Sequence, residues 1–320
     1  MENYLLDLLK NAIRERDLSR KTENAYVNHI RQFIEFSGEH DLENAGGGNI
    51  KAFLRHLEKN AHFAIATQRQ AVCALQFFYR EVFGREMSDY IKDIKRPPTT
   101  EKPPVILTPE EVRAVLSHLR GLPYLIAALM YGAGLRLNEA LSLRTSDVDF
   151  QRREITVRDN RTGAKDHTTI LPGLIAKHLQ KHLIEVKFLH EDDCLRGFGK
   201  VSLPAAIENR QPAAAHQWRW QYVFPAAKLT RDKNTGDFYR NHLGESVVQK
   251  AVSEAVEKAK VIKKACCQTL RHSFAVRLFE KNHDLYTVGN LLGHKNLRTT
   301  LVYTNAVARG ERKVLSPLDA

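Results

Sequence analysis

The residues of this 320-residue chain that are best suited to chemistry lie near its carboxyl end, at Arg271, His294 and Tyr303. An arginine guanidinium matches two phosphate oxygens at once. A phenol has a pKa near 10, so it becomes a nucleophile only where nearby cations favour the phenolate. If the fold brings these three side chains into one pocket, the sequence predicts attack on a phosphodiester.

A second arginine, Arg136, extends this site. Glu139 follows it by three residues, so its carboxylate can orient the guanidinium from the same helix face. Metal-free cleavage of a phosphodiester requires fixed cations on the non-bridging oxygens, and Arg136 and Arg271 are the predicted clamp. His294 is expected to donate a hydrogen bond to the phosphate. Taken singly, His294 is better interpreted as a capping histidine and Tyr303 as a core tyrosine, and it is their combination with the arginines that favours chemistry.

No metal or other cofactor is expected. The chain has four cysteines and fourteen histidines, and none of them has the spacing of a zinc knuckle, a redox motif or a zinc protease. The cysteines are expected to be reduced.

The elements that must position these side chains are mainly helices, with a small β-sheet. Thr108 to Glu111 combines an N-cap hydroxyl, a proline and a glutamate three residues after the cap, which predicts a helix start. Strand-like alternation around a polar turn predicts a hairpin from segments 154–157 and 168–171. Further helices are expected at about 172–189, 245–260, 269–282 and 284–292.

The division into domains is indicated by four prolines between Lys95 and Pro104, which disfavour helix and central strand. Upstream, apolar residues recur at steps of three and four, which is typical of packed amphipathic helices. We therefore expect a helical domain over 1–95, a linker over 96–107 and a catalytic domain over 108–320.

The charge of the chain favours a polyanionic partner. It has 49 Lys and Arg against 37 Asp and Glu, a net charge of +12 and a pI near 9.5. The alternative is a solvated positive surface on an ordinary enzyme. No apolar run approaches the length of a membrane span, and the amino terminus lacks the features of a signal peptide. A cytoplasmic protein without membrane partners is expected.

Four motifs, in this order and spacing, resemble the tyrosine site-specific recombinases. They are Gly134 to Glu139 (GLRLNE), Leu270 to His272 (LRH), Leu292 to His294 (LGH) and Tyr303. A narrower resemblance, to the integron integrases, is carried by an insert at about 190–243 and by the closing segment 315–318. The resemblance covers nearly the whole chain. It implies a helical, SAM-like core-binding domain followed by a tyrosine recombinase catalytic domain.

The resemblance also implies the catalytic set, which is Arg136, Lys165, Gln268, Arg271, His294 and Tyr303. Two positions depart from the family, and both concern proton transfer. Gln268 stands where the family has a histidine, and glutamine cannot shuttle a proton. In the hairpin turn, Arg161 falls at the usual lysine position, and Lys165 substitutes for that lysine only if the register of the hairpin shifts. A solvated loop charge is the alternative for Lys165, and reduced activity is one possible outcome of both changes.

The insert is expected to bind DNA. Trp218, Trp220, Tyr222 and Phe224 alternate with polar residues, and as a strand they would put four rings on one face. Rings of this kind can stack on unpaired bases, and the alternative is a core edge strand. By resemblance to integron integrases, the DNA-binding residues here are Trp218, Arg219, Trp220, Arg240 and His242.

The resemblance implies a site-specific recombinase that links Tyr303 to a 3′-phosphate and integrates and excises gene cassettes. The implied partners are duplex and folded single-stranded DNA, with a homotetramer on paired sites. The implied location is the bacterial cytoplasm, in association with the nucleoid. Two alternatives stay open: an impaired homologue that only binds DNA, and a type IB topoisomerase that relaxes supercoils.

Overall fold

The computed structural model describes residues 2–16, 18–38, 47–59, 65–87, 103–158, 166–232 and 235–308. The chain divides into two compact units, an N-terminal unit over Met1–Glu101 and a C-terminal unit over Lys102–Ala320. Most of the predicted linker at 96–107 lies outside the described residues. Residues 103–107 form neither helix nor strand.

The N-terminal unit is helical in its described part. It contains α1 (Glu2–Glu15), α2 (Arg20–Ser37), α3 (Gly47–Lys59) and α4 (Ile65–Phe83). Ser19 begins α2 as an N-cap, accepting a hydrogen bond from the Thr22 backbone N–H at 3.1 Å. The apolar faces meet in one core, where the rings of Phe33 and Phe53 pack edge to face with centroids 5.2 Å apart.

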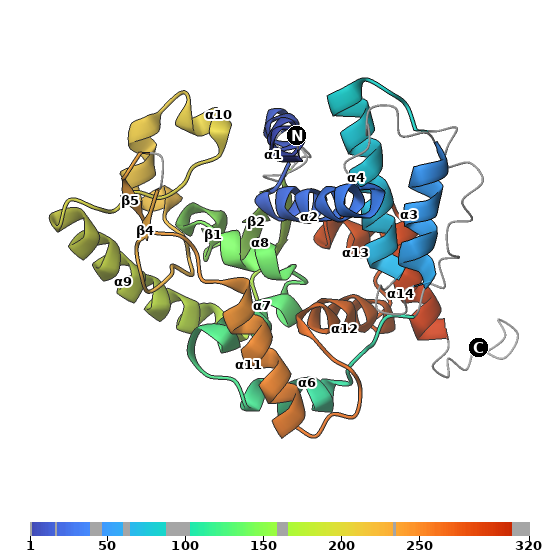
Figure 1. Ribbon diagram of the computed structural model, residues 1–320. Coiled ribbons are helices and arrows are strands. Elements are labelled where there is room, and N and C mark those ends of the chain that lie inside the picture. Colours follow the sequence, from blue (N-terminus) through green and yellow to red (C-terminus); the bar gives the residue numbers. More distant parts are fainter. Residues whose placement is uncertain are drawn as a thin grey trace, which may run out of the picture. The chain divides into compact units, whose positions relative to one another are not determined.

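The C-terminal unit is also mainly helical (Figure 1). Its longer helices are α6 (Pro109–Ser117), α7 (Gly121–Gly132), α8 (Leu137–Ser142), α9 (Gly173–Leu195), α11 (Glu245–Lys258), α12 (Cys267–Glu280), α13 (Leu285–Leu291) and α14 (Arg298–Ala308). The predicted capping box at the start of α6 is present, because Thr108 and Glu111 each accept from the other's backbone N–H. The predicted fold class, mainly α with a small sheet, is confirmed.

A three-stranded antiparallel sheet follows α8. The short η1 (Thr145–Asp147) leads into β1 (Val148–Asp149), which pairs with β2 (Glu154–Val157), and β2 pairs with β3 (His167–Ile170). Val157 lies opposite His167 in the register. The two long strands of the predicted hairpin are therefore present, and its turn, at 159–165, lies outside the described residues.

The insert begins at the far end of α9, where the chain leaves the other helices of this unit (Figure 1). It contains α10 (Ala205–Glu208), η2 (Pro212–His216), η3 (Trp218–Trp220), β4 (Thr230–Arg231) and β5 (Phe238–Tyr239). The predicted strand with four rings on one face is wrong. Trp218 and Trp220 belong to the 3-10 helix η3, and the chain then turns so that Tyr222 and Phe224 enter two different cores.

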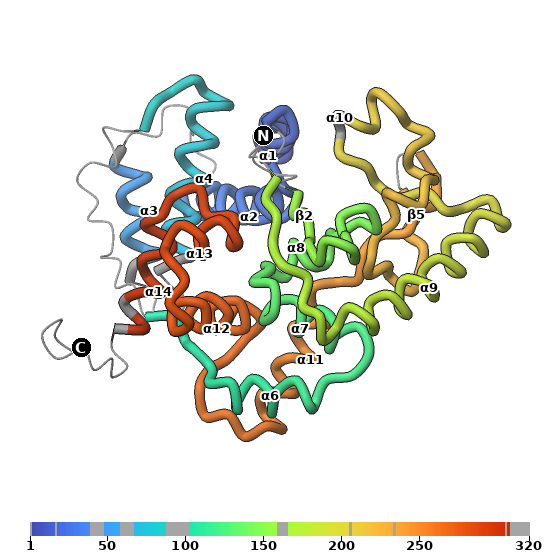
Figure 2. Tube along the Cα trace, turned by 180° about the vertical axis from the view of Figure 1, so that it is seen from behind, coloured from blue at the N-terminus to red at the C-terminus, as the bar shows by residue number. Residues whose placement is uncertain are grey.

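The last helices of the chain assemble the remaining part of this unit. In Figure 2, α12, α13 and α14 form one group, with α12 also packed on α7. Strand β3 lies beside this group, because α13 contacts β3. None of the helices in the described ranges is both long and apolar enough to span a bilayer.

Candidate active site

Arg271, on α12, is the buried centre of the site, with 1% of its surface exposed. Its Nη1 donates to the backbone oxygen of Gly134 at 2.8 Å, and its Nη2 donates to that of Leu292 at 2.6 Å. These two carbonyls belong to the turn before α8 and to the end of α13. Burial lowers the pKa of Arg271 to about 10, so the guanidinium remains a cation at neutral pH.

Glu139 joins the two predicted clamp residues. Its carboxylate accepts from Arg271 Nη1 at 3.1 Å and also forms a very short ion pair with Arg136 Nη1. The backbone N–H of Arg136 donates to Glu139 as well, at 2.7 Å, because Arg136 is the N-cap residue of α8. Arg136 is 43% exposed in its side chain. One carboxylate therefore holds a buried and an accessible guanidinium side by side.

His294 lies between Arg271 and Thr300. Its Nε2 is 3.3 Å from Arg271 Nη2, and its Nδ1 is 2.9 Å from the hydroxyl of Thr300. An arginine nitrogen can only donate, so Nε2 accepts and Nδ1 carries the proton in this arrangement. Burial, followed by the charges of Arg271 and Arg136, lowers the pKa of His294 to about 4.

Tyr303, on α14, stacks on His294 with ring centroids 6.3 Å apart and an interplanar angle of 10°. Its hydroxyl is 2.9 Å from Nδ1 of His272, the residue that follows Arg271. The ring is 5% exposed. Burial raises the pKa of Tyr303, and the charges of Arg271 and Arg136 act in the opposite direction. The phenol is thus protonated at rest, next to two cations that favour its ionisation.

Four of the six predicted catalytic residues, namely Arg136, Arg271, His294 and Tyr303, therefore lie together. Gln268 lies one turn before Arg271 in the first turn of α12, with its side chain exposed. Lys165, and Arg161 with it, fall outside the described residues.

The sequence interpretation missed three polar side chains at this site: His167, His272 and Thr300. His167 opens β3, and its ring lies against the backbone of Gly293, which has a φ of 62°. His272 was visible as part of the LRH motif. The six-residue separation of Thr300 from His294 gave no comparable signal, because His294 lies in the loop after α13 and Thr300 in the first turn of α14.

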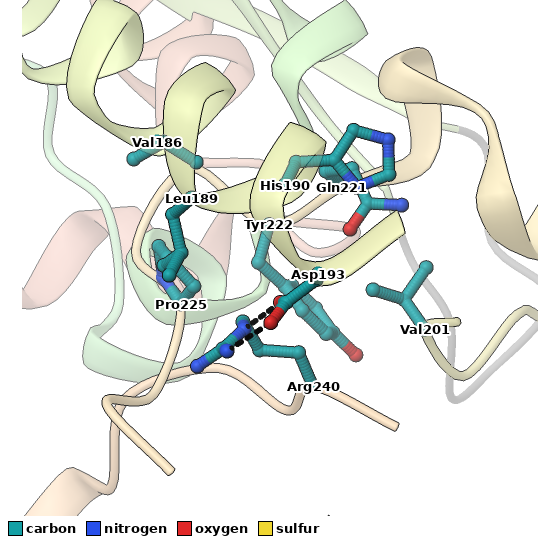
Figure 3. Close-up of a pocket in the computed structure, with 9 residues that line it drawn as sticks. All are labelled: Val186, Leu189, His190, Asp193, Val201, Gln221, Tyr222, Pro225 and Arg240. Atoms are coloured by element: carbon teal, nitrogen blue, oxygen red, sulfur yellow. Dashed lines mark hydrogen bonds and ion pairs between the residues drawn. The ribbon is translucent and has the colours of Figure 1, made fainter. Parts of the chain in front are cut away.

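Two of the five predicted DNA-binding residues have structural roles that account for them. Arg240 is buried and ion-paired with Asp193, whose Oδ1 accepts from Arg240 Nη2 at 2.7 Å (Figure 3). It also donates to the backbone oxygens of Ala226 and Ala227. Trp220 is 6% exposed and lies in the core of the insert. Without DNA, neither side chain is therefore presented at the surface, and DNA contact by Trp220 and Arg240 stays a prediction.

The other three predicted residues of the insert lie nearer the surface. Arg219 is exposed, and its guanidinium lies 5.6 Å from the ring centroid of Trp220. Trp218 is half-buried beside His190, with centroids 6.0 Å apart. His242 packs edge to face on Tyr222 and keeps part of its surface accessible. Only Arg219 and, in part, Trp218 and His242 remain available for a partner.

The site as a whole is a paired-arginine anion site with a buried phenol and neutral imidazoles. Among the described residues, no three histidine, cysteine or acidic side chains converge as metal ligands would. Chemically, the two guanidinium groups can neutralise an anion, and the phenol beside them is a group that can act as a nucleophile once it is ionised.

Comparison with known proteins agrees with this arrangement. Residues 106–309 match the phage integrase family, and residues 5–89 match the phage integrase N-terminal SAM-like domain. The chain is 38% identical over 316 residues to proteins called integrase/recombinase from Escherichia coli and Pseudomonas aeruginosa, covering 99% of this chain and 93% of each relative. It is 29% identical over 302 residues to the tyrosine recombinase XerA of Thermococcus kodakarensis, covering 92% of this chain and 88% of that protein.

Two solved structures share the fold. XerH site-specific recombinase, bound to a palindromic difH substrate, has a TM-score of 0.63 at 20% identity, with 93% of this chain and 80% of that chain covered. A lambda integrase dimer bound to a COC′ core site has a TM-score of 0.63 at 16% identity, with 98% and 80% covered. With the family match over most of the catalytic unit, the chain belongs to the phage integrase family, the tyrosine site-specific recombinases.

Proposed function

We propose that this protein is a site-specific DNA recombinase that cleaves and rejoins strands through a 3′-phosphotyrosyl intermediate. The observation that carries the proposal is the cluster in which Glu139 holds Arg136 and Arg271 beside the stacked rings of His294 and Tyr303. A net charge of +12 supports a nucleic acid as the anionic partner.

The scissile phosphate binds where Arg136 is accessible and Arg271 Nη2 faces His294. An oxygen of the phosphate can take the place of His294 Nε2 as acceptor from Arg271. An anion in this position also favours protonation of His294, whose Nε2 then donates to the phosphate. Nδ1 carries a proton in both states, so the Thr300 hydroxyl accepts from it before and after His294 is protonated.

Tyr303 then attacks phosphorus. A bond forms between its phenolic oxygen and phosphorus, and the bond from phosphorus to the 5′-oxygen breaks. The phenol loses its proton, and Nδ1 of His272, 2.9 Å away, is positioned to receive it. Both arginines neutralise the charge that accumulates on the non-bridging oxygens. A 5′-hydroxyl from a second strand reverses the step, so bond energy is kept in the phosphotyrosine.

Within the family, we propose an integron-integrase type of activity, the integration and excision of gene cassettes. Its support is the insert that α9 carries, with Arg219 exposed beside a partly accessible Trp218. The proposed partners are duplex and folded single-stranded recombination sites, bound by four copies of this chain in the bacterial cytoplasm. The proposed domains are 1–95 and 108–320, joined by a linker.

Covalent trapping tests the proposal. A suicide substrate is nicked so that the fragment leaving after cleavage diffuses away, and it is offered both as a duplex and as a folded single strand. We expect a protein–DNA adduct that survives denaturation, and we expect none from Tyr303→Phe, which keeps the ring but lacks the nucleophile.

The alternative outcomes separate the competing functions. Binding without any adduct, together with an adduct from Gln268→His, indicates a DNA-binding homologue that has lost cleavage. If the protein forms an adduct and relaxes supercoiled DNA but never joins two sites, it is a topoisomerase. Cassette-type activity requires joined products from a folded single-stranded site.

A further inference from the structure

His167 lies at the active site in a position that the chemistry described so far does not use. Its ring fits against Gly293, the residue before His294. A Cβ atom on Gly293 would lie 2.4 Å from Cε1, 2.5 Å from Nδ1 and 2.7 Å from Nε2 of His167. Only a glycine can accept the imidazole at this distance, because any other side chain would overlap the ring.

The electrostatic surroundings of His167 are those of the arginine clamp. The half-buried ring has its pKa lowered, first by burial and then by the charges of Arg271 and Arg136. The carboxylates of Glu139 and Asp166 act in the opposite direction. His294, on the other side of Gly293, is in turn affected by His167. Charged groups on three segments, namely α8 with its N-cap, α12 and the residue before β3, therefore act on this imidazole.

Its two nitrogens are available for a ligand. None of the described residues hydrogen-bonds to the His167 ring. The other two imidazoles differ, since His272 contacts the hydroxyl of Tyr303 and His294 lies between Arg271 and Thr300. Of these three histidines, His167 is the one whose ring nitrogens can take a hydrogen-bond partner from the substrate.

We propose that His167 is a further catalytic residue, which protonates the 5′-oxygen as Tyr303 displaces it. This inference rests on the proposed function. The imidazolium transfers its proton to the 5′-oxygen as the bond to phosphorus breaks, and the phenolic proton passes to His272. In the reverse step the 5′-hydroxyl returns its proton to His167, and His272 returns one to the phenol. Protons and charge balance in both directions.

The other polar residues of the cluster are less suited to this transfer. Gln268 has no titratable proton. Arg271 already donates through both terminal nitrogens to carbonyls, and a guanidinium is a poor acid near neutral pH. An imidazole can both give and take a proton in this range, and the negative phosphate counteracts the arginine charges that disfavour its charged form.

The test compares two suicide substrates, one with the normal 5′-oxygen and one with sulfur in its place. A thiolate leaves without a proton, so loss of the general acid slows cleavage of the oxygen substrate only. For His167→Gln we expect adduct formation to slow by about 10²- to 10⁴-fold on the oxygen substrate. On the sulfur substrate we expect a rate close to that of the unmodified protein.

Two further variants keep the result unambiguous. His178→Gln, at an exposed position on α9, is the matched control and should cleave both substrates normally. Lys165→Gln tests the rival donor predicted from the sequence. The inference is overturned if the rate of adduct formation by His167→Gln falls by the same factor on both substrates, or does not fall at all. If the sulfur substrate restores the rate of Lys165→Gln but not that of His167→Gln, the proton donor is Lys165.

Failure of this inference is distinguishable from failure of the proposed function. If the unmodified protein forms no adduct with either substrate, the proposed function itself is wrong. If it forms one that depends on Tyr303 but not on His167, the function stands and the proton comes from another group.

Discussion

The side chains of the candidate site illustrate how burial changes what a residue can do. Arg271 and His294 are a hydrogen bond apart, yet one is a cation and the other is kept neutral. Burial penalises the charged form of both, but a guanidinium starts from a much higher pKa. The carboxylate of Glu139 compensates for the proximity of the two arginines. With two guanidinium groups and one carboxylate, the resting site has a net positive charge and can bind an anion.

The neutral state of His294 has a consequence for stability. Its folded pKa is about 4, whereas an unfolded histidine has a pKa near 6.5. As pH falls from about 6.5 towards 4, the unfolded chain takes up a proton that the folded chain refuses. We expect the free energy of unfolding to fall over this window, and to fall less steeply in His294→Gln. Urea denaturation at several pH values measures both slopes.

The matched control for this titration is His178→Gln, which removes an exposed histidine from α9. His167 and His272 also have lowered pKa values, so part of the slope should persist in the His294 variant. Identical slopes for the unmodified protein and His294→Gln would contradict the assignment of a buried neutral imidazole.

Residue types, together with the order and spacing of the motifs, predicted that the two arginines, His294 and Tyr303 would lie in one pocket, and the structure brings them together. They could not reveal Thr300 or the approach of His167 to Gly293, since both depend on how α13 and α14 pack. They could not reveal the buried partner of Arg240 either, because Asp193 lies on α9 and is distant in sequence.

Among the elements, the turn between α7 and α8 leaves no room for a side chain at Gly134. Gly134 has a φ of 70°, and a Cβ atom there would lie 2.5 Å from the ring of Phe274. Its carbonyl accepts from Arg271. The turn thus places Arg136, at the N-cap of α8, near Arg271 of α12, where Glu139 pairs with both. The sequence placed Arg136 and Glu139 of the GLRLNE motif on one helix face, but the need for a glycine at 134 arises from Phe274, which is distant in sequence.

Gly134→Ala should therefore destabilise the protein by more than backbone strain alone. Strain at positive φ costs about 1–3 kcal/mol, and overlap with Phe274 should add about 1–3 kcal/mol. Gly121→Ala is the control, because Gly121 has a φ of 56° with nothing within 4 Å of an added Cβ. Thermal unfolding should show a larger loss for Gly134→Ala, and equal losses would refute the close approach of Phe274.

The insert is an element with its own small core. That core contains Trp220 and Tyr222, and Arg144 lies on the Tyr222 ring, 3.6 Å from its centroid. Alternation of rings and polar residues suggested a strand, because a period of two is the usual signature of one. Here a 3-10 helix and the extended segment after it gave the same alternation: Trp220 and Tyr222 enter the core of the insert, and Phe224 enters the main core of the unit.

Asp193→Asn tests the role of the buried ion pair in the insert. Both partners are nearly inaccessible, with 2% and 8% of their side chains exposed. Breaking such a pair leaves Arg240 uncompensated and should cost about 3–5 kcal/mol. Asp192→Asn breaks an exposed pair with Arg196 and should cost less than about 1 kcal/mol. Thermal unfolding compares them, and similar losses would contradict the buried role.

At the scale of the whole molecule, the excess of positive charge should govern association with DNA. Each phosphate neutralised by a lysine or arginine releases condensed counterions, so affinity depends steeply on salt. For a chain with a net charge of +12 we expect binding to duplex DNA to weaken by about 10³-fold or more between about 50 and 200 mM salt. Fluorescence anisotropy of a labelled duplex measures this.

The control for the salt titration is the thermal unfolding of the free protein at the same salt concentrations, which should change little. A binding constant that stays level across this range would mean that the excess lysine and arginine residues do not face the nucleic acid. The charge would then only keep the protein in solution.

The bonds of Arg271 carry one last consequence. This one side chain ties together the turn after α7, the first turn of α8 and the end of α13. A lysine, with a single terminal nitrogen, cannot satisfy three such acceptors in their present places. Loss of activity in an Arg271 variant could therefore come from a disturbed structure as well as from the missing charge. Arg136, at the rim, is the arginine whose replacement can isolate the contribution of charge to rate.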